Sequence, residues 1–219
     1  MAKIKAEFLD KIADIRKKGG VELRSISDIG VNVRSEESKT PTIQGYAAVV
    51  ETPSTGLWWE EIILRGAFDG CDFSLCRGLF NHNEEAILGS VKAGTVRCDV
   101  DDKGLRYEID TPDIDIIQAM YVQPIVRGDV DKSSFRFSMD FSNPDAWPDE
   151  WMYDEERDII VRKIKKIASV LDVSPVLFPA YDAAESSVRA ASTLLDLHKK
   201  AASEEKAAGS FQASPIFYM

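Results

Sequence analysis

The sequence has 219 residues, of which 44% are hydrophobic and 29% are charged, as in an ordinary soluble globular protein. Acidic residues outnumber basic ones by 37 to 27, and a formal net charge of −10 argues against a surface built for nucleic acid or anionic membrane. No apolar run approaches the roughly 18 residues that span a bilayer, and the N-terminus lacks the pattern of a signal peptide. Three cysteines, an odd and sparse set, suit a reducing compartment. We therefore expect an intracellular protein.

The first predicted element is an N-terminal helix. Residues 3–18 carry apolar side chains at helical spacing, and "KKGG" then ends the pattern with cations and glycines. We expect residues 1–20 to form a helical arm, with the body of the protein beginning at residue 21.

The body begins with strand patterns. Short segments rich in β-branched and aromatic residues are separated by turn signals, and "DDKG" predicts a hairpin turn between the last two of them. A helix is predicted over 112–123, where Thr111 provides the cap and Pro124 should end or kink the helix. The predicted strands are 42–50, 57–64, 94–100 and 104–110.

The segment "SSFRFSMDF" (133–141) alternates strictly, which predicts a strand with one buried face. Phe135 and Ser133 share the core face, whereas Ser134 and Arg136 lie on the opposite face, where a substrate can reach them. A nucleophilic serine must be accessible, so Ser134 is a better candidate nucleophile than Ser133.

The last third of the chain is harder to assign. In residues 157–171 the isoleucine spacing fits a helix, while the β-branched content fits a strand. The two prolines of "SPVLFPAY" forbid a helix through that segment. A helix is predicted from residue 182, and residues 191–219 are expected to form its end and a flexible tail.

Only two histidines are present, His82 in "LFNHN" and His198 in a highly charged segment that we expect to be an exposed helix end. Histidine is the side chain whose ordinary pKa allows proton transfer near neutral pH, so His82 is the candidate base. A lone histidine is more often structural than catalytic, so this motif alone leaves both interpretations open.

Six sequence blocks together carry a resemblance to a known family. In chain order they are "GYAAV" (45–49), "EEIILRGAF" (60–68), "LFNHNEEAILG" (79–89), "GLRYEID" (104–110), "SSFRFSM" (133–139) and "LDVSPVLFPAY" (171–181). Their order and spacing resemble the prohead, or capsid-maturation, serine proteases of tailed bacteriophages, a family similar in fold to the herpesvirus assemblins. The resemblance covers about residues 21–190.

The resemblance implies a set of catalytic residues. It places the catalytic histidine at His82 and the nucleophile at Ser134, in agreement with the strand alternation. Asp172 fills the place of the third member, where the family usually has Glu, and Glu108 is the second choice for this acid. Arg136 stands where the family usually has glycine, so it could contact the substrate or crowd the site. An oxyanion hole is also needed, and the sequence does not identify its donors; the loop at 179–182 is one candidate.

The resemblance also implies the fold and the function. The implied fold class is mainly β with peripheral helices. Residues 21–190 are expected to form a small closed or nearly closed β-barrel that resembles the herpesvirus protease fold. The implied activity is that of a serine endopeptidase that cleaves scaffolding protein, or a scaffold-like extension of the coat protein, inside the procapsid in the host cytoplasm. Self-cleavage in the arm and tail, and self-association, are further expectations. No cofactor, metal, nucleic acid or membrane is expected as a partner.

Two alternatives remain open from the sequence. The first is a Cys₃His zinc site in a binding module, for which the ligand types are right, although "CDFSLC" lacks a tight glycine turn. The second is a non-catalytic β-barrel that builds or scaffolds a viral assembly. The zinc ligands would be Cys71, Cys76, His82 and Cys98.

Overall fold

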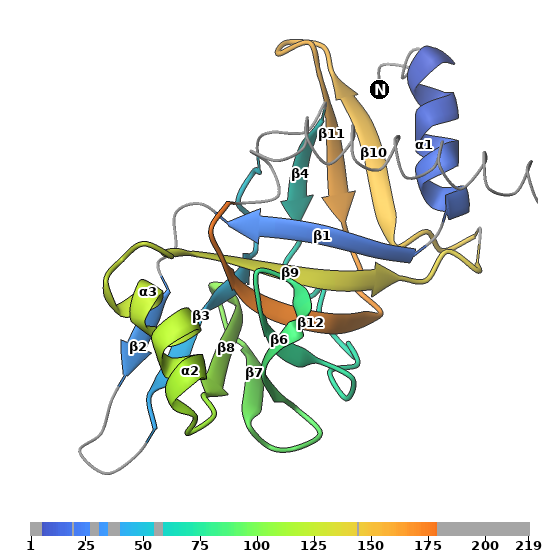
Figure 1. The fold of residues 1–219 in the computed structure, drawn as a ribbon. Coiled ribbons are helices and arrows are strands. Elements are labelled where there is room, and N and C mark those ends of the chain that lie inside the picture. The colour runs from blue at the N-terminus through green and yellow to red at the C-terminus, as the bar shows by residue number, and fades with distance from the viewer. Residues whose placement is uncertain are drawn as a thin grey trace, which may run out of the picture. The chain divides into compact units, whose positions relative to one another are not determined.

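The structure, a computed structural model, is mainly β with a few helices (Figure 1). The described residues belong to one compact unit that spans Met1–Asp182. They are residues 6–18, 20–26, 31–34, 40–54, 59–143 and 145–178.

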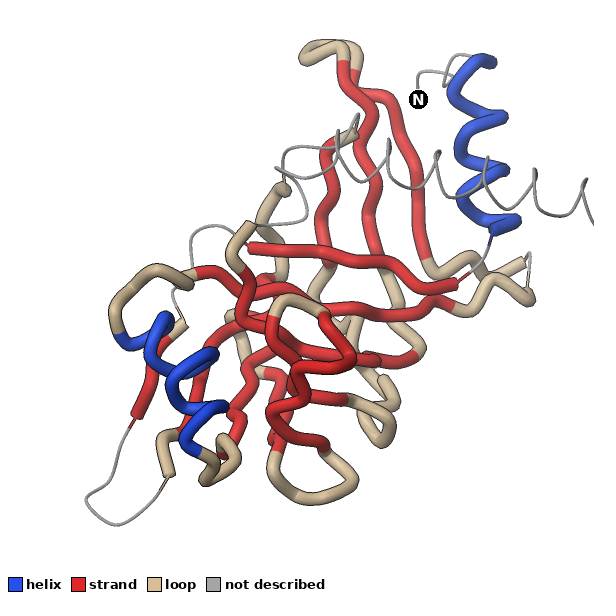
Figure 2. The backbone as a smooth tube through the Cα atoms, viewed as in Figure 1, coloured by secondary structure: helices blue, strands red, loops and turns tan. Residues whose placement is uncertain are grey.

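The elements follow one another in the order that Figures 1 and 2 show. The helical elements are α1 (Ala6–Lys18), α2 (Asp115–Ile117), the π-helical turn η1 (Gln118–Val122) and α3 (Gln123–Val126). None of the helices in the described ranges is long and apolar enough to cross a membrane. The strands are β1 (Gly20–Ile26), β2 (Asn32–Arg34), β3 (Thr42–Val49), β4 (Glu60–Ile63), β5 (Arg77–Phe80), β6 (Asn83–Ser90), β7 (Val96–Val100), β8 (Gly104–Asp110), β9 (Lys132–Met139), β10 (Asp149–Asp154), β11 (Ile159–Ile164) and β12 (Ser169–Val176).

The described strands form three hydrogen-bonded sheets (Figure 1). One has the order β1-β9-β12-β5-β6, one the order β10-β11-β4, and one the order β2-β3-β8-β7. Pairing is antiparallel except between β12 and β5 and between β11 and β4. The prediction of a mainly β protein with few helices is confirmed. A closed barrel is not seen among the described strands, and the likeness to the herpesvirus protease fold stays a prediction.

The core lies beneath β9, where the predicted alternation is confirmed. Phe135 and Phe137 are fully buried and stack with ring centroids 4.8 Å apart. Ser133 shares their face, and its hydroxyl lies 2.9 Å from the Tyr107 hydroxyl of β8. The core face of β9 is thus packed against β8, and this contact fixes which residues of β9 point the other way.

The ambiguous segment 157–171 is extended, forming β11 and the first part of β12. Its isoleucine spacing suggested a helix, but a separation of four residues also places side chains on one face of a strand. Ile160 and Ile164 of β11 are both buried. The β-branched content was therefore the better guide, because these side chains pack well on a pleated surface.

The helix predicted at 112–123 differs from the observed one in two ways. It begins at Asp115, and Thr111 is not its cap, because the Thr111 hydroxyl donates to the carbonyl oxygen of Pro41 at 2.6 Å. The helical path also continues beyond Pro124. The π turn η1 directly precedes this proline, and a turn of this kind accommodates the missing N–H within a continuing helix.

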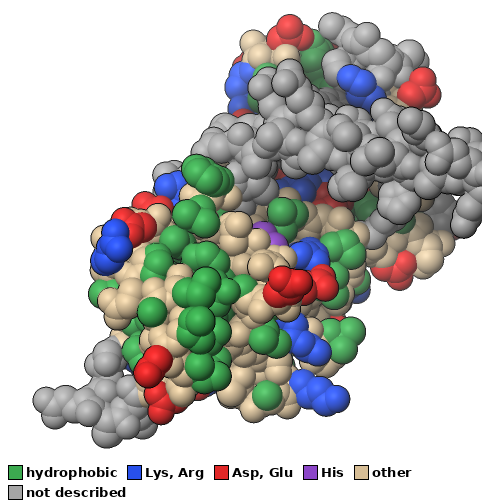
Figure 3. Space-filling model, in the orientation of Figure 1, with side chains coloured by type: hydrophobic (Ala, Val, Ile, Leu, Met, Phe, Trp, Pro, Cys, Tyr) green, Lys and Arg blue, Asp and Glu red, His purple; other side chains and the backbone are tan. Residues whose placement is uncertain are grey.

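The helical segment leaves large hydrophobic side chains at the surface. Four of them, from this segment, are each more than half exposed: Ile114, Ile116, Met120 and Val126. Figure 3 shows hydrophobic side chains gathered on the face of the molecule that it presents. Exposed hydrophobic patches commonly mark surfaces that bind another protein.

Gly104 closes the predicted "DDKG" hairpin with φ +150°, and a Cβ there would lie 2.1 Å from the carbonyl oxygen of Ala48 in β3. We expect Gly104→Ala to lower the free energy of unfolding by about 2 kcal/mol or more, because the clash involves two paired backbones. Gly70→Ala is the control: it also has positive φ, +72°, but open space around its Cβ. Urea unfolding should show a smaller loss for Gly70→Ala, about 1 kcal/mol. Equal losses would contradict the steric argument.

Candidate active site

Neighbouring strands of the five-stranded sheet carry the predicted site residues (Figure 1). β12 lies between β9 and β5, so its side chains can contact residues from both. In the β9–β12 ladder, Ser174 pairs with Ser134 and Asp172 pairs with Arg136. Residues two apart in a strand point to the same face. Asp172 lies two residues from Ser174, the partner of Ser134, so Ser134 and Asp172 share one face of adjacent strands.

His82 lies in the tight turn between β5 and β6. Phe80 and Asn83 pair across the turn, and the two central residues, Asn81 and His82, have φ values of +55° and +56°. Positive φ at both central positions is typical of a type I′ hairpin, and Asn and His tolerate it better than most residues. The N–H of Asn81 donates to the carbonyl oxygen of Pro175 in β12 at 2.9 Å. This bond ties the turn to the strand that carries Asp172.

The structure brings His82, Ser134 and Asp172 together through two hydrogen bonds. His82 Nδ1 lies 2.5 Å from Asp172 Oδ1, and His82 Nε2 lies 2.6 Å from Ser134 Oγ. The imidazole keeps 12% of its side-chain surface exposed, while the Asp172 side chain keeps 3%. Both ring nitrogens thus have partners, and the arrangement can pass a proton from the serine hydroxyl to the imidazole.

The expectation that Ser134 lies on an accessible face is wrong in this structure, because the residue has no exposed surface. The reason is β1, a strand that the sequence did not predict. It pairs with β9 along its whole length, and Ser25 lies opposite Ser134. The Ser134 hydroxyl donates to the carbonyl oxygen of Arg24 at 2.8 Å. The alternation of β9 was right, but β1 covers the strand edge at Ser134 and the His82 ring contacts its hydroxyl on the other face.

Asp172 is held by two residues besides His82. The Ser174 hydroxyl donates at 2.8 Å to Oδ1, the same oxygen that His82 contacts. Arg136 Nε lies 3.0 Å from Oδ2, as an ion pair without an aligned hydrogen bond, and another Arg136 nitrogen donates to the His82 carbonyl oxygen at 3.2 Å. Arg136 therefore contacts the acid and the histidine turn. Sequence reasoning missed Ser174, although alternation in "DVS" puts it on the face of Asp172.

Glu108, the second choice for the acid, lies elsewhere. Its carboxylate pairs with Arg97 and Arg106 in the β7–β8 hairpin. The contacts of the described residues do not join it to His82. The geometry thus favours Asp172 over Glu108 as the partner of the imidazole.

Several predicted features lie outside the described residues: the loop at 179–182, the helix from residue 182, His198 and the tail. Just before β4, Trp59 packs edge-on against Trp151 with ring centroids 5.3 Å apart.

The cysteines do not assemble with His82 into a Cys₃His set. Cys76 Sγ lies 3.9 Å from Cys98 Sγ, while both nitrogens of His82 contact other residues. Burial raises the pKa of Cys71 to about 12, which disfavours the thiolate that binds zinc. Within the described ranges, no three His, Cys, Asp or Glu side chains lie where they could hold a metal ion. The zinc-module alternative has no support in this geometry.

Comparison with known proteins gives one match. The family described as caudovirus prohead serine protease matches residues 29–200, which is most of the chain and includes all three predicted site residues. No curated protein and no solved structure matches the sequence. The matched region begins after β1, so this strand precedes the part of the chain that the family describes.

Proposed function

The chain belongs to the caudovirus prohead serine protease family, and from this premise we propose that it cleaves peptide bonds through Ser134, His82 and Asp172. Family membership makes it a serine peptidase of phage capsid maturation. The single observation that supports these three residues is the hydrogen-bonded chain from Ser134 through His82 to Asp172.

The proposed reaction is acyl transfer to serine and then to water. His82 Nε2 takes the Ser134 proton as Oγ attacks the peptide carbonyl carbon, and the imidazolium then gives this proton to the leaving amine. His82 next takes a proton from water, whose oxygen attacks the acyl carbon, and the imidazolium returns that proton to Ser134 Oγ as the bond between Oγ and the acyl group breaks. Asp172 keeps Nδ1 protonated and stabilises the imidazolium. Ser174 and Arg136 act as positioning residues, since each contacts the carboxylate of Asp172.

We further propose the setting of the reaction. The substrates are the major capsid protein, the scaffolding protein, or both, inside the procapsid in the host cytoplasm, with self-cleavage in the arm and tail. Residues 1–20 serve as the arm, 21–190 as a protease domain with the barrel of the herpesvirus proteases, and 191–219 as the tail.

Covalent labelling tests the nucleophile. A fluorophosphonate should add once per chain during long incubation, as Ser134 Oγ bonds to phosphorus and fluoride leaves, and peptide mapping should place the adduct on Ser134. His82→Ala should lose the label, because the hydroxyl then lacks its base. Ser133→Ala should keep it, because Ser133 contacts Tyr107 on the core face. A label that persists in Ser134→Ala would contradict the assignment. If neither the folded wild type nor a folded variant that frees Ser134 takes up the label, the result would favour the non-catalytic assembly protein.

A further inference from the structure

β1 places a backbone carbonyl of the chain itself against the proposed nucleophile. Residues 20–26 pair antiparallel with residues 133–139, and the Ser134 hydroxyl donates to the Arg24 carbonyl oxygen at 2.8 Å. A hydroxyl has one proton, so while Ser134 donates it to Arg24, the hydroxyl cannot donate to His82. The Arg24 carbonyl thus engages the Ser134 proton and keeps the hydroxyl in a resting arrangement.

The side chains of β1 alternate between solvent and a buried pocket. Val21 and Leu23 are 56% and 37% exposed, whereas Arg24 is buried. The Arg24 guanidinium makes a two-point contact with the carboxylate of Glu61 in β4: Nη2 lies 2.9 Å from Oε2, and Nε bonds to Oε1. The guanidinium carbon also lies 5.8 Å from the ring centroid of Phe137. Glu61 is 2% exposed, so this pocket surrounds the cation.

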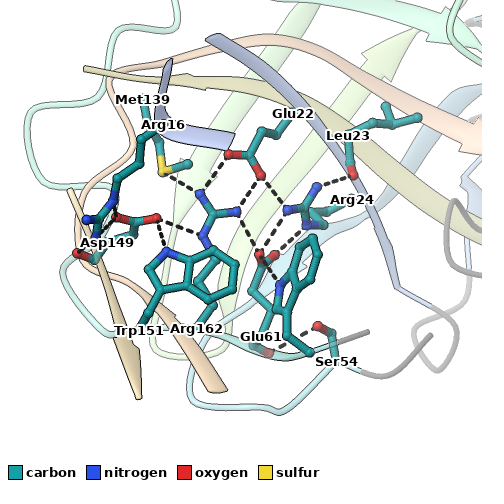
Figure 4. Close-up of polar contacts among 11 residues, drawn as sticks. Arg16, Glu22, Leu23, Arg24, Ser54, Glu61, Met139, Asp149, Trp151 and Arg162 are labelled. Carbon is teal, nitrogen blue, oxygen red and sulfur yellow. Dashed lines mark hydrogen bonds and ion pairs between the residues drawn. The ribbon is translucent and has the colours of Figure 1, made fainter. Parts of the chain in front are cut away.

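The second inward side chain of β1, Glu22, has its own partner. Arg162 of β11 has no exposed surface, and its two terminal nitrogens donate to the two carboxylate oxygens of Glu22 at 2.6 and 2.8 Å. Arg162 also contacts Glu61 at 3.1 Å and Asp149 at 2.9 Å, and it lies 5.1 Å from the ring centroid of Trp151 (Figure 4). Glu22 also pairs with the Arg24 guanidinium, so the two inward side chains of β1 are held by Arg162, by Glu61 and by each other.

The pocket wall outside β1 consists of Glu61, Asp149 and Arg162, and Arg16 of α1 pairs with Asp149 at 2.9 Å. Glu61 is the carboxylate of this wall that Arg24 of β1 contacts. Burial acts to raise the pKa of Glu61, but Arg24 and Arg162 outweigh it and hold the pKa below its ordinary value. A buried carboxylate that loses its cation is strongly unfavourable. Glu61 is thus matched to a basic side chain on whichever strand lies along β9.

We infer that β1 occupies the peptide-binding edge of β9, and that Glu61 and Arg162 select substrates with the pattern acidic–any–basic before the scissile bond. This inference rests on the proposed function. A peptide that adds as a strand to β9 presents alternate side chains to the pocket, as Glu22 and Arg24 do. Its basic side chain binds Glu61, its acidic one binds Arg162, and the carbonyl of the basic residue meets Ser134. Cleavage then gives that residue a new carboxylate and leaves an amine on the next residue.

Three peptides of identical flanking sequence test the pattern on the full-length chain. They carry Glu-Leu-Arg, Glu-Leu-Gln or Gln-Leu-Arg before the scissile bond. Relative to Glu-Leu-Arg, we expect kcat/KM to fall about 100-fold for Glu-Leu-Gln and about tenfold for Gln-Leu-Arg. Decreases of this size correspond to the loss of a buried hydrogen bond to a charged group. The assay uses Arg24→Ala, in which β1 has lost its anchor to Glu61. This variant should react with fluorophosphonate at least tenfold faster than wild type, while Leu23→Ala, altered on the solvent side of β1, should match wild type.

Glu61→Gln in the Arg24→Ala chain tests the receptor of the basic side chain. It should remove most of the preference for Glu-Leu-Arg over Glu-Leu-Gln. The matched control is Glu60→Gln, which alters the adjacent carboxylate. Glu60 pairs with the exposed Arg157, so this substitution should leave the preference unchanged. If Glu61→Gln does not fold, the three peptides with Arg24→Ala still decide the question.

The outcomes separate this inference from the proposed function. If Arg24→Ala carries the label on Ser134 but cleaves the three peptides equally, the inference is overturned and the proposed function stands. Equal labelling rates for wild type and Arg24→Ala would also overturn it, because β1 would not restrict access to Ser134. If no form of the chain is labelled or cleaves any peptide, the proposed function fails and the inference fails with it.

Discussion

Procapsids assembled with the Ser134→Ala chain should retain full-length capsid and scaffolding proteins. The substitution removes only the Oγ atom that His82 Nε2 and the Arg24 carbonyl contact, so the fold should remain intact. In serine proteases the loss of the nucleophile costs about 10⁶-fold in kcat. The measurement is the intact mass of the capsid proteins from assemblies made with wild type or with the variant.

The neighbouring serine provides the control for this experiment. Ser133→Ala removes a hydroxyl of the same kind one residue away, at a cost in stability of about 1–3 kcal/mol because the buried Tyr107 hydroxyl loses its partner. Processing should continue with that chain. If assemblies made with Ser134→Ala contain capsid proteins shortened to the same mass as those made with wild type, Ser134 is excluded as the nucleophile.

Asp172→Asn should lower kcat/KM for peptide cleavage by about 10⁴-fold. An amide has nearly the shape of the carboxylate, but it can donate to Nδ1 of His82 and so favour the wrong tautomer. It also removes the charge that Arg136 faces and that stabilises the imidazolium. Asp172→Glu should stay within about tenfold of wild type, because Glu is usual at this place in proteins of the family that the sequence resembles.

Glu108→Gln is the matched control for the acid. Its carboxylate pairs with Arg97 and Arg106 in the β7–β8 hairpin, so neutralising it should leave the cleavage rate close to that of wild type. The opposite pattern, with Asp172→Asn within tenfold of wild type and Glu108→Gln inactive, would mean that the acid is misassigned. Ser134 and His82 would remain the proposed pair in that case.

The sequence alone determined the features that depend on local geometry. Strict alternation in β9 set Phe135 and Ser133 on the core side and Ser134 on the other, because successive strand residues point to opposite faces. The "DDKG" turn and the strands on either side of it followed from turn chemistry and β-branched content. Collinear motifs indicated the family. The scarcity of histidine left His82 as the candidate base, and the structure brings it within hydrogen-bond reach of Ser134 and Asp172.

Only the tertiary structure decided features that depend on pairing between distant segments. Helical and strand periodicities coincide at a spacing of four, so packing had to choose the strand for Ile160 and Ile164. The burial of Ser134 depends on β1, which lies more than a hundred residues earlier and carries no local signal of its partner. The charged pocket likewise joins β1, β4, β10 and β11, and a charged residue in sequence gives no sign of the partner that will bury it. Sequence patterns report the period and the face of one segment, whereas an edge strand or a buried ion pair is determined by whichever segments the whole chain brings together.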